Sequence, residues 1–145
     1  DPKYQNKGFI KFDKMYETAN KLIEQYDVRS GEGAKSITRG MSGGNQQKVC
    51  LAKAFTMNPE VLFVSEPTRG IDVGAKKLVL DTLKEYNKEK GTTIIITSSE
   101  IEELRSVCDR IAIINEGKVE GILPPTADIL EFGKMMVGVK EAGNE

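Results

Sequence analysis

The sequence has 145 residues, of which 39% are hydrophobic and 30% are charged, so it is long enough for one domain with a core. Its net charge of −1 provides no basic field, so nucleic acid is not expected as a partner. No apolar run reaches the roughly 20 residues that cross a bilayer, and the chain begins at Asp1 without a signal peptide, as a fragment would. We therefore expect any membrane link to come through a partner subunit.

The first predicted element is an amphipathic helix. Residues 1–7 are polar and are expected to be frayed. Apolar residues then recur at helical spacing, with Asp13 as a plausible N-cap. We expect this stripe to pack on neighbouring elements; it consists of Phe12, Met15, Tyr16, Ala19, Leu22, Ile23 and Tyr26.

Residues 29–40 are polar and rich in glycine, which predicts a connector. Lys35-Ser36 within it suggests a phosphate-binding Walker A loop, G-x-x-x-x-G-K-[S/T]. Aligned on that pattern, however, Ala34 and Arg29 occupy the two glycine positions, and no buried strand precedes them. We therefore interpret this segment as a connector.

Strands and helices alternate after residue 40. A helix is predicted over residues 44–57, with Val49, Ala52 and Phe55 on one face, and it ends at Asn58-Pro59. The continuous apolar run at 61–64 is typical of a central parallel strand that is covered on both faces. A helix over 73–88 should place Ala75, Val79, Leu83 and Tyr86 inward and end at Gly91.

The C-terminal third contains a further strand, a hairpin and two helices. A β-branched strand is predicted at 93–97, and Ser99 to Glu102 have capping-box spacing for a short helix. Residues 110–115 and 118–122 flank Glu116-Gly117 as a hairpin, and a last helix follows Pro124-Pro125, with Ile129, Leu130 and Phe132. The alternation indicates an α/β layered fold with a largely parallel sheet.

The two cysteines, Cys50 and Cys108, lie in different contexts. Cys50 falls among apolar residues of a predicted helix, and Cys108 just precedes a strand. We expect buried free thiols, consistent with a reducing compartment, although the sequence alone leaves a disulfide open. Zinc is not expected, because the chain has no histidine and no CxxC pair.

The segment with the clearest chemistry is Ser42-Gly43-Gly44, which opens the helix predicted from Gly44. Two glycines let backbone N–H groups approach a ligand closely, and a helix N-terminus presents unsatisfied N–H groups that suit a phosphate. The Ser42 hydroxyl could cap the helix or contact the anion. The alternative is a turn and N-cap with no ligand.

Other polar residues have a structural alternative. Glu66, at a strand end, could hold or polarise a water, or could cap neighbouring backbone. Asp72 could be the N-cap of the helix that follows it. We interpret Arg69 with Lys76-Lys77 as a solvated helix start rather than a phosphate cluster, and Lys48 similarly as solvated.

Several of these segments resemble the motifs of ATP-binding cassette (ABC) ATPases, in the same order along the chain. Ser42 to Lys48 resemble the signature motif, with the Asn-Gln-Gln-Lys spelling of the second cassette of bacterial ribose/galactose-type importers. Residues 66–76 resemble the end of the Walker B strand plus the D-loop, and Ser98-Ser99-Glu100 resemble the switch region. The resemblance covers about Gly8 to Gly138.

The resemblance implies a fold and a domain division. The fold would be the C-terminal part of a P-loop NTPase, with a mostly parallel sheet flanked by helices and part of the helical subdomain. Residues 1–40 would form that helical part and the connector, and residues 41–145 the C-terminal part of the ATPase core. The Walker A loop and the Q-loop glutamine would lie upstream of Asp1, so alone the chain should bind ATP weakly or not at all.

The resemblance also implies roles for individual residues. Glu66 matches the catalytic glutamate. The nucleotide-binding residues of the signature and D-loop would be Ser42, Gly43, Gly44, Asn45, Gln46 and Asp72, while no residue of the chain is assigned as a metal ligand. The cofactors implied are ATP and Mg²⁺, bound in the intact protein at a site that is incomplete here.

Two departures from the family pattern concern residues that are present. Ser65 stands where the Walker B strand has an aspartate, and a neutral hydroxyl is a poor partner for Mg²⁺. Ser99 stands where the wider superfamily has a histidine, although serine is usual in the second cassette of sugar importers. We therefore expect the chain's own site to be slow or dead, while its signature closes over ATP held by another cassette.

The function implied is that of an ATPase component of a carbohydrate or nucleoside importer, active as a transport-coupled ATPase only in the full protein. Its partners would be the other nucleotide-binding cassette, the transmembrane permease and, indirectly, a solute-binding protein. It would lie in the cytoplasm, against the inner face of the membrane. The alternatives are a non-transport ABC ATPase and a non-enzymatic dimerisation fragment.

Overall fold

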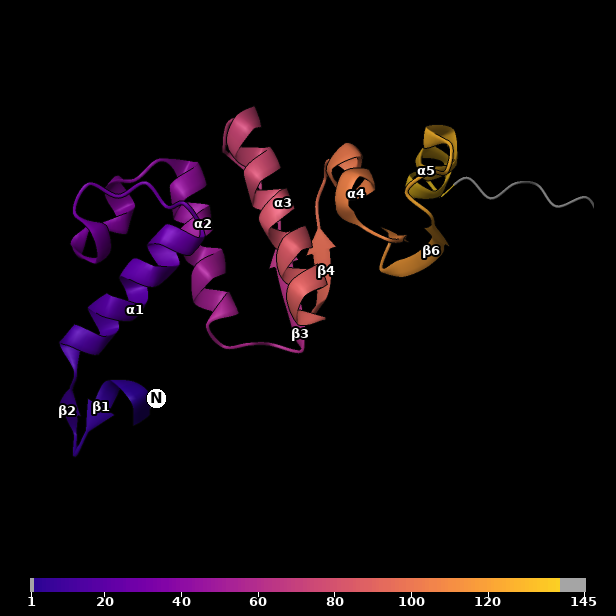
Figure 1. Ribbon diagram of the computed structural model, residues 1–145. Coiled ribbons are helices and arrows are strands. Elements are labelled where there is room, and N and C mark those ends of the chain that lie inside the picture. Colours follow the sequence, from indigo (N-terminus) through magenta and orange to yellow (C-terminus); the bar gives the residue numbers. More distant parts are fainter. Residues whose placement is uncertain (1, 139–145) are drawn as a thin grey trace, which may run out of the picture. The chain divides into compact units, whose positions relative to one another are not determined.

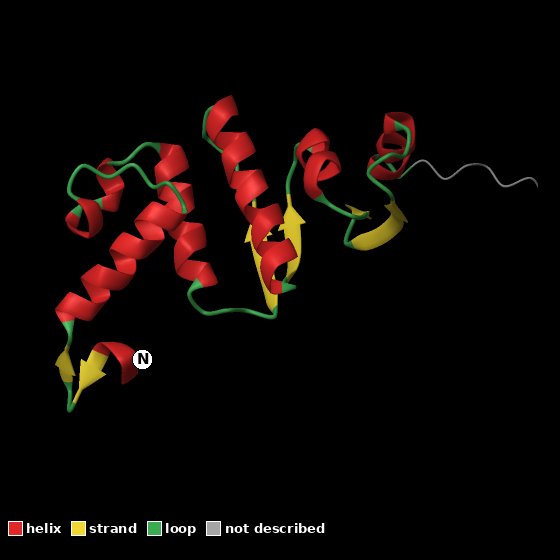
Figure 2. Ribbon diagram, viewed as in Figure 1, coloured by secondary structure: helices red, strands yellow, loops and turns green. Residues whose placement is uncertain are grey.

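The computed structural model describes residues 2–138 and divides the chain into two compact units, which meet between Ile95 and Ile96. Figure 1 gives the order of the elements and Figure 2 their type. The first unit holds the segments that resemble the signature, the Walker B strand and the D-loop. The second holds the segment that resembles the switch region and a C-terminal hairpin with its helix.

The N-terminal residues form a small ordered hairpin, so the prediction of a frayed end is wrong for residues 2–7. A 3₁₀ turn, η1 (Pro2–Tyr4), leads into β1 (Gln5–Asn6), which pairs antiparallel with β2 (Phe9–Ile10). Left-handed backbone at Lys7 and Gly8, with φ of 47° and 86°, makes the two-residue turn.

Helix α1 spans Phe12–Gln25. Its N-cap is Lys11, which makes no side-chain capping bond, and Asp13 lies in the first turn, so the predicted Asp13 cap is wrong. None of the helix's 14 residues is buried, and Phe12 and Met15 are 57% and 42% exposed. The predicted packing of the whole stripe is therefore wrong within the described residues, although Leu22 and Ile23 near the C-terminal end are half-buried.

The connector between α1 and α2 contains two short 3₁₀ turns, η2 (Gly33–Lys35) and η3 (Thr38–Gly40). Lys35 ends η2, and Ser36 after it has extended backbone, so no α-helix begins there. This confirms the interpretation of the segment as a connector.

Helices α2 (Gly43–Phe55) and α3 (Val73–Lys90) form the core of the first unit. At its centre the ring of Phe55 stacks on that of Tyr86, with centroids 3.7 Å apart and planes 10° apart. The Tyr86 hydroxyl also donates a hydrogen bond to the Phe55 carbonyl oxygen at 3.2 Å. The other buried apolar side chains of these helices are Leu51, Ala52, Val79, Leu80 and Leu83.

Strands β3 (Val61–Ser65) and β4 (Thr93–Thr97) pair in a two-stranded sheet, and α3 connects them. Figure 1 shows the two strands running in the same direction, as a helical crossover requires. In β3 exposed residues alternate with half-buried ones, and Phe63 is 74% exposed. The prediction that this strand is covered on both faces is therefore wrong for the described part of the chain.

Helix α3 ends where the sequence predicts. Gly91 is its C-cap with φ 68°, and its N–H donates to the Asn87 carbonyl at 2.8 Å. A residue without Cβ adopts this left-handed conformation at little cost, and the chain turns there into β4.

The second unit contains α4 (Ile101–Val107), the antiparallel hairpin β5 (Ile111–Asn115) and β6 (Lys118–Leu123), and α5 (Ile129–Met136). Its small core consists of Ile111, Ile113 and Phe132. The hairpin and the last helix confirm the sequence prediction. Left-handed φ of 48° at Glu116 and 77° at Gly117 gives the turn whose twist suits a hairpin.

The start of α4 differs from its prediction. Its N-cap is Glu100, which makes no side-chain capping bond, so the Ser99–Glu102 capping box is wrong. The Ser98 hydroxyl instead accepts from the Glu100 N–H at 3.0 Å. Ser98 and Ser99 both precede α4. The turn between β4 and α4 decides which of the two hydroxyls accepts a hydrogen bond from the backbone at the start of the helix.

The two cysteines are free thiols in the described structure. Cys50 is exposed, so the prediction that it is buried is wrong: it lies on the outer face of α2, opposite the residues that form the core. Cys108 is half-buried against the Ile111–Phe132 core, and this burial raises the pKa of its thiol, with a further contribution from Asp109.

Candidate functional site

The signature segment lies at the N-terminal tip of α2, on the surface. Ser42 is the N-cap of the helix, with extended backbone at φ −61° and ψ 154°. Ser42 and Gly43 are exposed, whereas Gly44 is buried. The first N–H groups of the helix, which have no partner within the helix, are therefore presented at an open surface.

The glycine pair is required by close packing. A Cβ at Gly44 would lie 2.7 Å from the Cβ of Ala75, and one at Gly43 would lie 3.0 Å from Cγ2 of Ile71 and 3.3 Å from the Gly70 carbonyl oxygen. Side chains at these positions would push α2 away from residues 70–75. The glycines thus bring the tip of α2 against the D-loop segment, whatever the tip binds.

Asn45 uses both ends of its amide within the first unit. Its Oδ1 accepts a hydrogen bond from the Arg29 N–H at 2.9 Å, and its Nδ2 donates to the Ser42 hydroxyl oxygen at 2.9 Å. Gln46, next to it, donates from Nε2 to the Met41 carbonyl oxygen at 2.8 Å. Two signature side chains therefore hold the backbone and the hydroxyl at the tip.

Asp72 caps helix α3. Its Oδ1 accepts from the Ala75 N–H at 3.0 Å, which confirms the N-cap interpretation. The residue is exposed and, with Ser42 and Asn45, lines a shallow pocket of about 250 Å³ between α2 and α3. The capping bond uses only one of the two carboxylate oxygens, so the cap is compatible with a nucleotide-binding role for Asp72.

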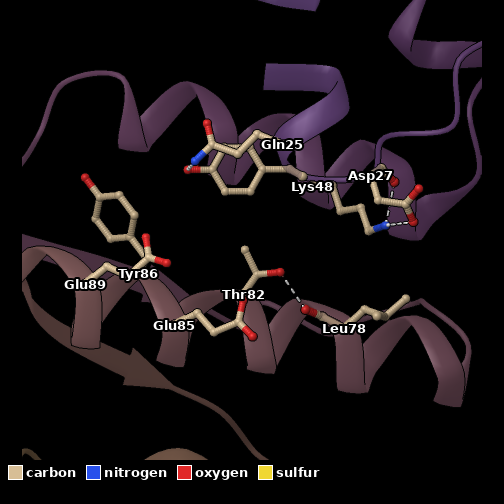
Figure 3. A pocket seen from close by; sticks show the side chains of 9 residues that line it. Gln25, Asp27, Lys48, Leu78, Thr82, Glu85, Tyr86 and Glu89 are labelled. Atoms are coloured by element: carbon tan, nitrogen blue, oxygen red, sulfur yellow. Dashed lines mark hydrogen bonds and ion pairs between the residues drawn. The ribbon is translucent and has the colours of Figure 1, made fainter. Parts of the chain in front are cut away.

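Lys48 is buried, and the prediction that it is solvated is wrong. The residue is 7% exposed, and its Nζ donates to the Asp27 carbonyl oxygen at 2.6 Å and to Asp27 Oδ2 at 3.2 Å. Figure 3 shows the ammonium group directed at Asp27. The burial of Lys48 could have been predicted from its position on α2, because it follows helical spacing along the buried face with Gly44, Leu51 and Phe55.

A second pocket of about 220 Å³ lies beside Lys48, between the end of α1 and the outer turns of α3 (Figure 3). Tyr26 lines it and packs against Phe55, with ring centroids 5.5 Å apart. Burial raises the pKa of Tyr26, and the neighbouring Tyr86 and Glu89 raise it further. Three of its nine lining residues are acidic, namely Asp27, Glu85 and Glu89.

Glu66 follows β3 directly, with left-handed backbone at φ 48°. It is half-buried, and its carbonyl oxygen accepts from the Arg69 N–H at 3.2 Å. The next two residues, Pro67 and Thr68, are buried and fix the turn. Ser65, the last residue of the strand, lies on its exposed face.

The switch-like residues belong to the second unit. Ser98 donates to Glu103 Oε2 at 3.0 Å, and Ser99 is exposed. Within the first unit, by contrast, the structure brings Ser42, Asn45 and Asp72 together around one pocket. Sequence reasoning missed Lys48, which lines the same pocket.

The order of the motifs and the exposed helix tip define an ATP-binding cassette domain, and the comparisons agree. The family model described as "ABC transporter" matches residues 2–69. A solved dimeric cassette, MJ0796 bound to ADP and Pi, shares the fold with a TM-score of 0.68 at 24% identity, over 85% of this chain and 52% of that one. The chain belongs to the ATP-binding domains of ABC transporters.

Within this family the chain resembles import proteins in particular. It is 39% identical over 138 residues to the nucleoside import ATP-binding protein NupA of Lactococcus lactis, which covers 94% of this chain and 27% of that protein. It is 43% identical over 123 residues to the ribose import ATP-binding protein RbsA of Clostridium perfringens, covering 83% and 24%. The chain thus spans about a quarter of the length of these relatives.

Residues 2–138 contain no helix that is both long enough and apolar enough to span a membrane. The same residues contain no group of three or more His, Cys, Asp or Glu side chains that could hold a metal ion.

Proposed function

We propose that this chain is part of the ATP-hydrolysing subunit of an ABC importer for nucleosides or ribose-type sugars. The names of its relatives support the substrate class, since they are nucleoside and ribose import ATP-binding proteins. The subunit would hydrolyse ATP in the cytoplasm, against the inner face of the membrane. Its partners would be a second cassette, a transmembrane permease and, indirectly, a solute-binding protein.

The tip of α2 would be donated to ATP held by the other cassette. The observation that carries this proposal is the exposure of Ser42 and Gly43 at the start of a 13-residue helix. N–H groups there and the positive end of the helix dipole favour a phosphate, and the Ser42 hydroxyl can donate to it. Because Gly44 packs on Ala75, the tip is held at a fixed place beside the D-loop segment.

The chain's own catalytic position would be degenerate. Glu66, at the end of β3, would orient the attacking water. Mg²⁺ is a hard cation that is usually bound through one or two carboxylates plus substrate phosphates, and Ser65 places a neutral hydroxyl where the family pattern has an aspartate. The residues present would therefore hold Mg²⁺ poorly, and the sequence holds no G-x-x-x-x-G-K-[S/T] loop.

The test of donation is a substitution at the tip in the intact protein that carries this chain. Ser42→Arg places a long side chain where the phosphate would approach, and we expect ATP turnover and transport to fall at least tenfold. Cys50→Ser, an exposed neutral change on the same helix, is the matched control and should leave both unchanged. If Ser42→Arg retains full turnover and transport, donation of this tip is wrong.

A second substitution tests the degenerate site. Ser65→Asp restores a carboxylate at the end of β3, and we expect a gain in ATPase rate if this position limits turnover. A nucleotide-binding titration of these 145 residues beside the intact protein should give much weaker binding for the shorter chain. An equal affinity would contradict the requirement for a partner cassette.

A further inference from the structure

The side chain of Asn45 bridges the tip of α2 and the segment that follows α1. Its two hydrogen bonds, to the Arg29 N–H and to the Ser42 hydroxyl oxygen, are each 2.9 Å long. Residues 42 and 45 are one helical turn apart, whereas Arg29 lies 16 residues away in sequence. One amide group thus joins the signature serine to a distant piece of backbone.

The orientation of this amide is determined by its partners. A backbone N–H can only donate, so the Asn45 oxygen must face Arg29 and the NH₂ group must face Ser42. Since the NH₂ group can also only donate, the Ser42 oxygen accepts from it. The hydroxyl proton of Ser42 is then not used in this bond and is left for another acceptor, and Ser42 itself is exposed.

Lys48 holds the same segment one turn further along α2. Its buried ammonium group donates to the carbonyl oxygen of Asp27, two residues before Arg29. The residue between them, Val28, is 6% exposed and belongs to the core. Residues 27–29 are therefore attached to α2 at both ends, and the bond to Asn45 rests on a fixed partner.

We propose that Asn45 is a positioning residue that acts through Ser42: it orients the serine hydroxyl as a donor toward a phosphate and ties that orientation to residues 27–29. This inference rests on the proposed function, in which Ser42 faces the phosphates of ATP. It assigns to Asn45 a role inside the chain in place of direct contact with nucleotide. A hydroxyl already oriented needs no reordering when the phosphate arrives.

Two substitutions in the intact protein separate the two hydrogen bonds. Asn45→Asp keeps an acceptor for Arg29 but replaces the donor to Ser42 by a second acceptor, which would accept a hydrogen bond from the serine hydroxyl and so turn that hydroxyl toward residue 45. Asn45→Leu, of similar size, removes both bonds and adds no charge. Cys50→Ser serves as the control on the same helix.

The first measurement is hydrogen exchange of the Arg29 amide, followed by mass spectrometry on a peptide that covers residues 27–30. We expect protection to persist in Asn45→Asp and to be lost in Asn45→Leu, with no change in the control. Protection that survives in Asn45→Leu would overturn the tether, because the Arg29 N–H would then have another partner.

The second measurement is ATP turnover with and without Ser42→Ala. We expect both Asn45 variants to lower turnover about tenfold, but Asn45→Leu to have less than a twofold effect once Ser42 is alanine, since residues that act through one another are not additive. An undiminished effect in the Ser42→Ala background would overturn the positioning role while leaving the proposed function intact. If Ser42→Ala alone leaves turnover unchanged, the hydroxyl has no role at the phosphate and the positioning role is wrong, whereas the proposed function fails only if Ser42→Arg also leaves turnover unchanged.

Discussion

Gly44 and Ala75 are in such close contact that a methyl group on the glycine would lie 2.7 Å from the alanine Cβ. This contact joins the first turn of α2 to the first turn of α3. The requirement for glycine in the signature therefore has a packing component in addition to any contact with nucleotide. The two components make different predictions.

If packing matters, Gly44→Ala should destabilise the chain by about 1–3 kcal/mol, the usual cost of an extra methyl group in a packed site. Urea unfolding followed by circular dichroism measures this. The double variant Gly44→Ala with Ala75→Gly should recover much of the loss, because it moves the methyl group across the same contact. Gly40→Ala is the control, since a Cβ there meets nothing within 4 Å.

A loss that Ala75→Gly fails to relieve would contradict the packing argument. Such a result would place the strain elsewhere, for instance at the start of α2 itself. Equal losses in Gly44→Ala and Gly40→Ala would also contradict a specific contact at Gly44, because a Cβ at Gly40 meets nothing within 4 Å.

Lys48→Met should cost more stability than Asp27→Asn. The ammonium group is buried, and its shorter bond, 2.6 Å, is to the Asp27 backbone carbonyl, which only the lysine substitution leaves unpaired. We expect about 1–3 kcal/mol for Lys48→Met, the cost of an unsatisfied buried group. Asp27→Asn should change stability by about 0.5 kcal/mol or less, because that side chain is 73% exposed and asparagine tolerates left-handed backbone.

Thermal unfolding of the two variants under one buffer compares them directly. A larger loss in Asp27→Asn would show that the carboxylate, rather than the carbonyl, neutralises Lys48. Salt gives an independent check, since a charge pair weakens with ionic strength and a bond to a carbonyl does so far less.

Tyr86→Phe isolates the hydroxyl of the central aromatic pair. It removes the 3.2 Å bond to the Phe55 carbonyl and keeps the stacked rings, so we expect a loss of about 1 kcal/mol. Tyr86→Ala should cost about 3–5 kcal/mol, because it also leaves a cavity between α2 and α3. Chemical denaturation of the two variants gives the difference, and similar losses in both would mean that the ring contributes little.

The two thiols should differ in reactivity. Cys50 is exposed, whereas burial and Asp109 raise the pKa of Cys108, so iodoacetamide at pH 8 should label Cys50 first. A raised pKa keeps the thiol protonated in the folded state, so its contribution to stability is fully present below the unfolded pKa of about 8.5 and is lost as the pH rises from there through the raised pKa of the folded state. Cys50→Ser, which leaves one reactive position, permits the rate at Cys108 to be followed from pH 7 to 10; a rate as fast as in urea-unfolded protein would contradict its protection.

Sequence patterns predicted the elements whose signals are local. Gly91 ends α3, and Glu116-Gly117 turns the hairpin, because each signal depends on backbone conformation at one or two residues. The same holds for Asp72, whose capping bond reaches only three residues ahead. Local signals of this kind also located the signature at the start of α2.

Burial was predicted less well, since it depends on partners that are distant in sequence. Helical spacing indicates the buried face on which Lys48 lies, but its partner, a carbonyl oxygen 21 residues away that accepts a hydrogen bond from it, is not indicated by any pattern around either residue. The exposed face of β3 and the exposed stripe of α1 were predicted to be buried because they are apolar. Apolar composition does not specify which element, if any, packs against such a surface. At the N-terminus, the polar composition predicted a frayed end, and the hairpin there was missed because it depends on left-handed backbone at Lys7.

The left-handed backbone at Glu66 bears on how this protein could be altered. Residues other than glycine and asparagine adopt that conformation at a cost of about 1–2 kcal/mol, so Glu66→Asn should increase the free energy of unfolding. Selection for thermal stability alone would therefore favour variants that lack the Glu66 carboxylate. Variants selected in this way should also be assayed for ATPase activity.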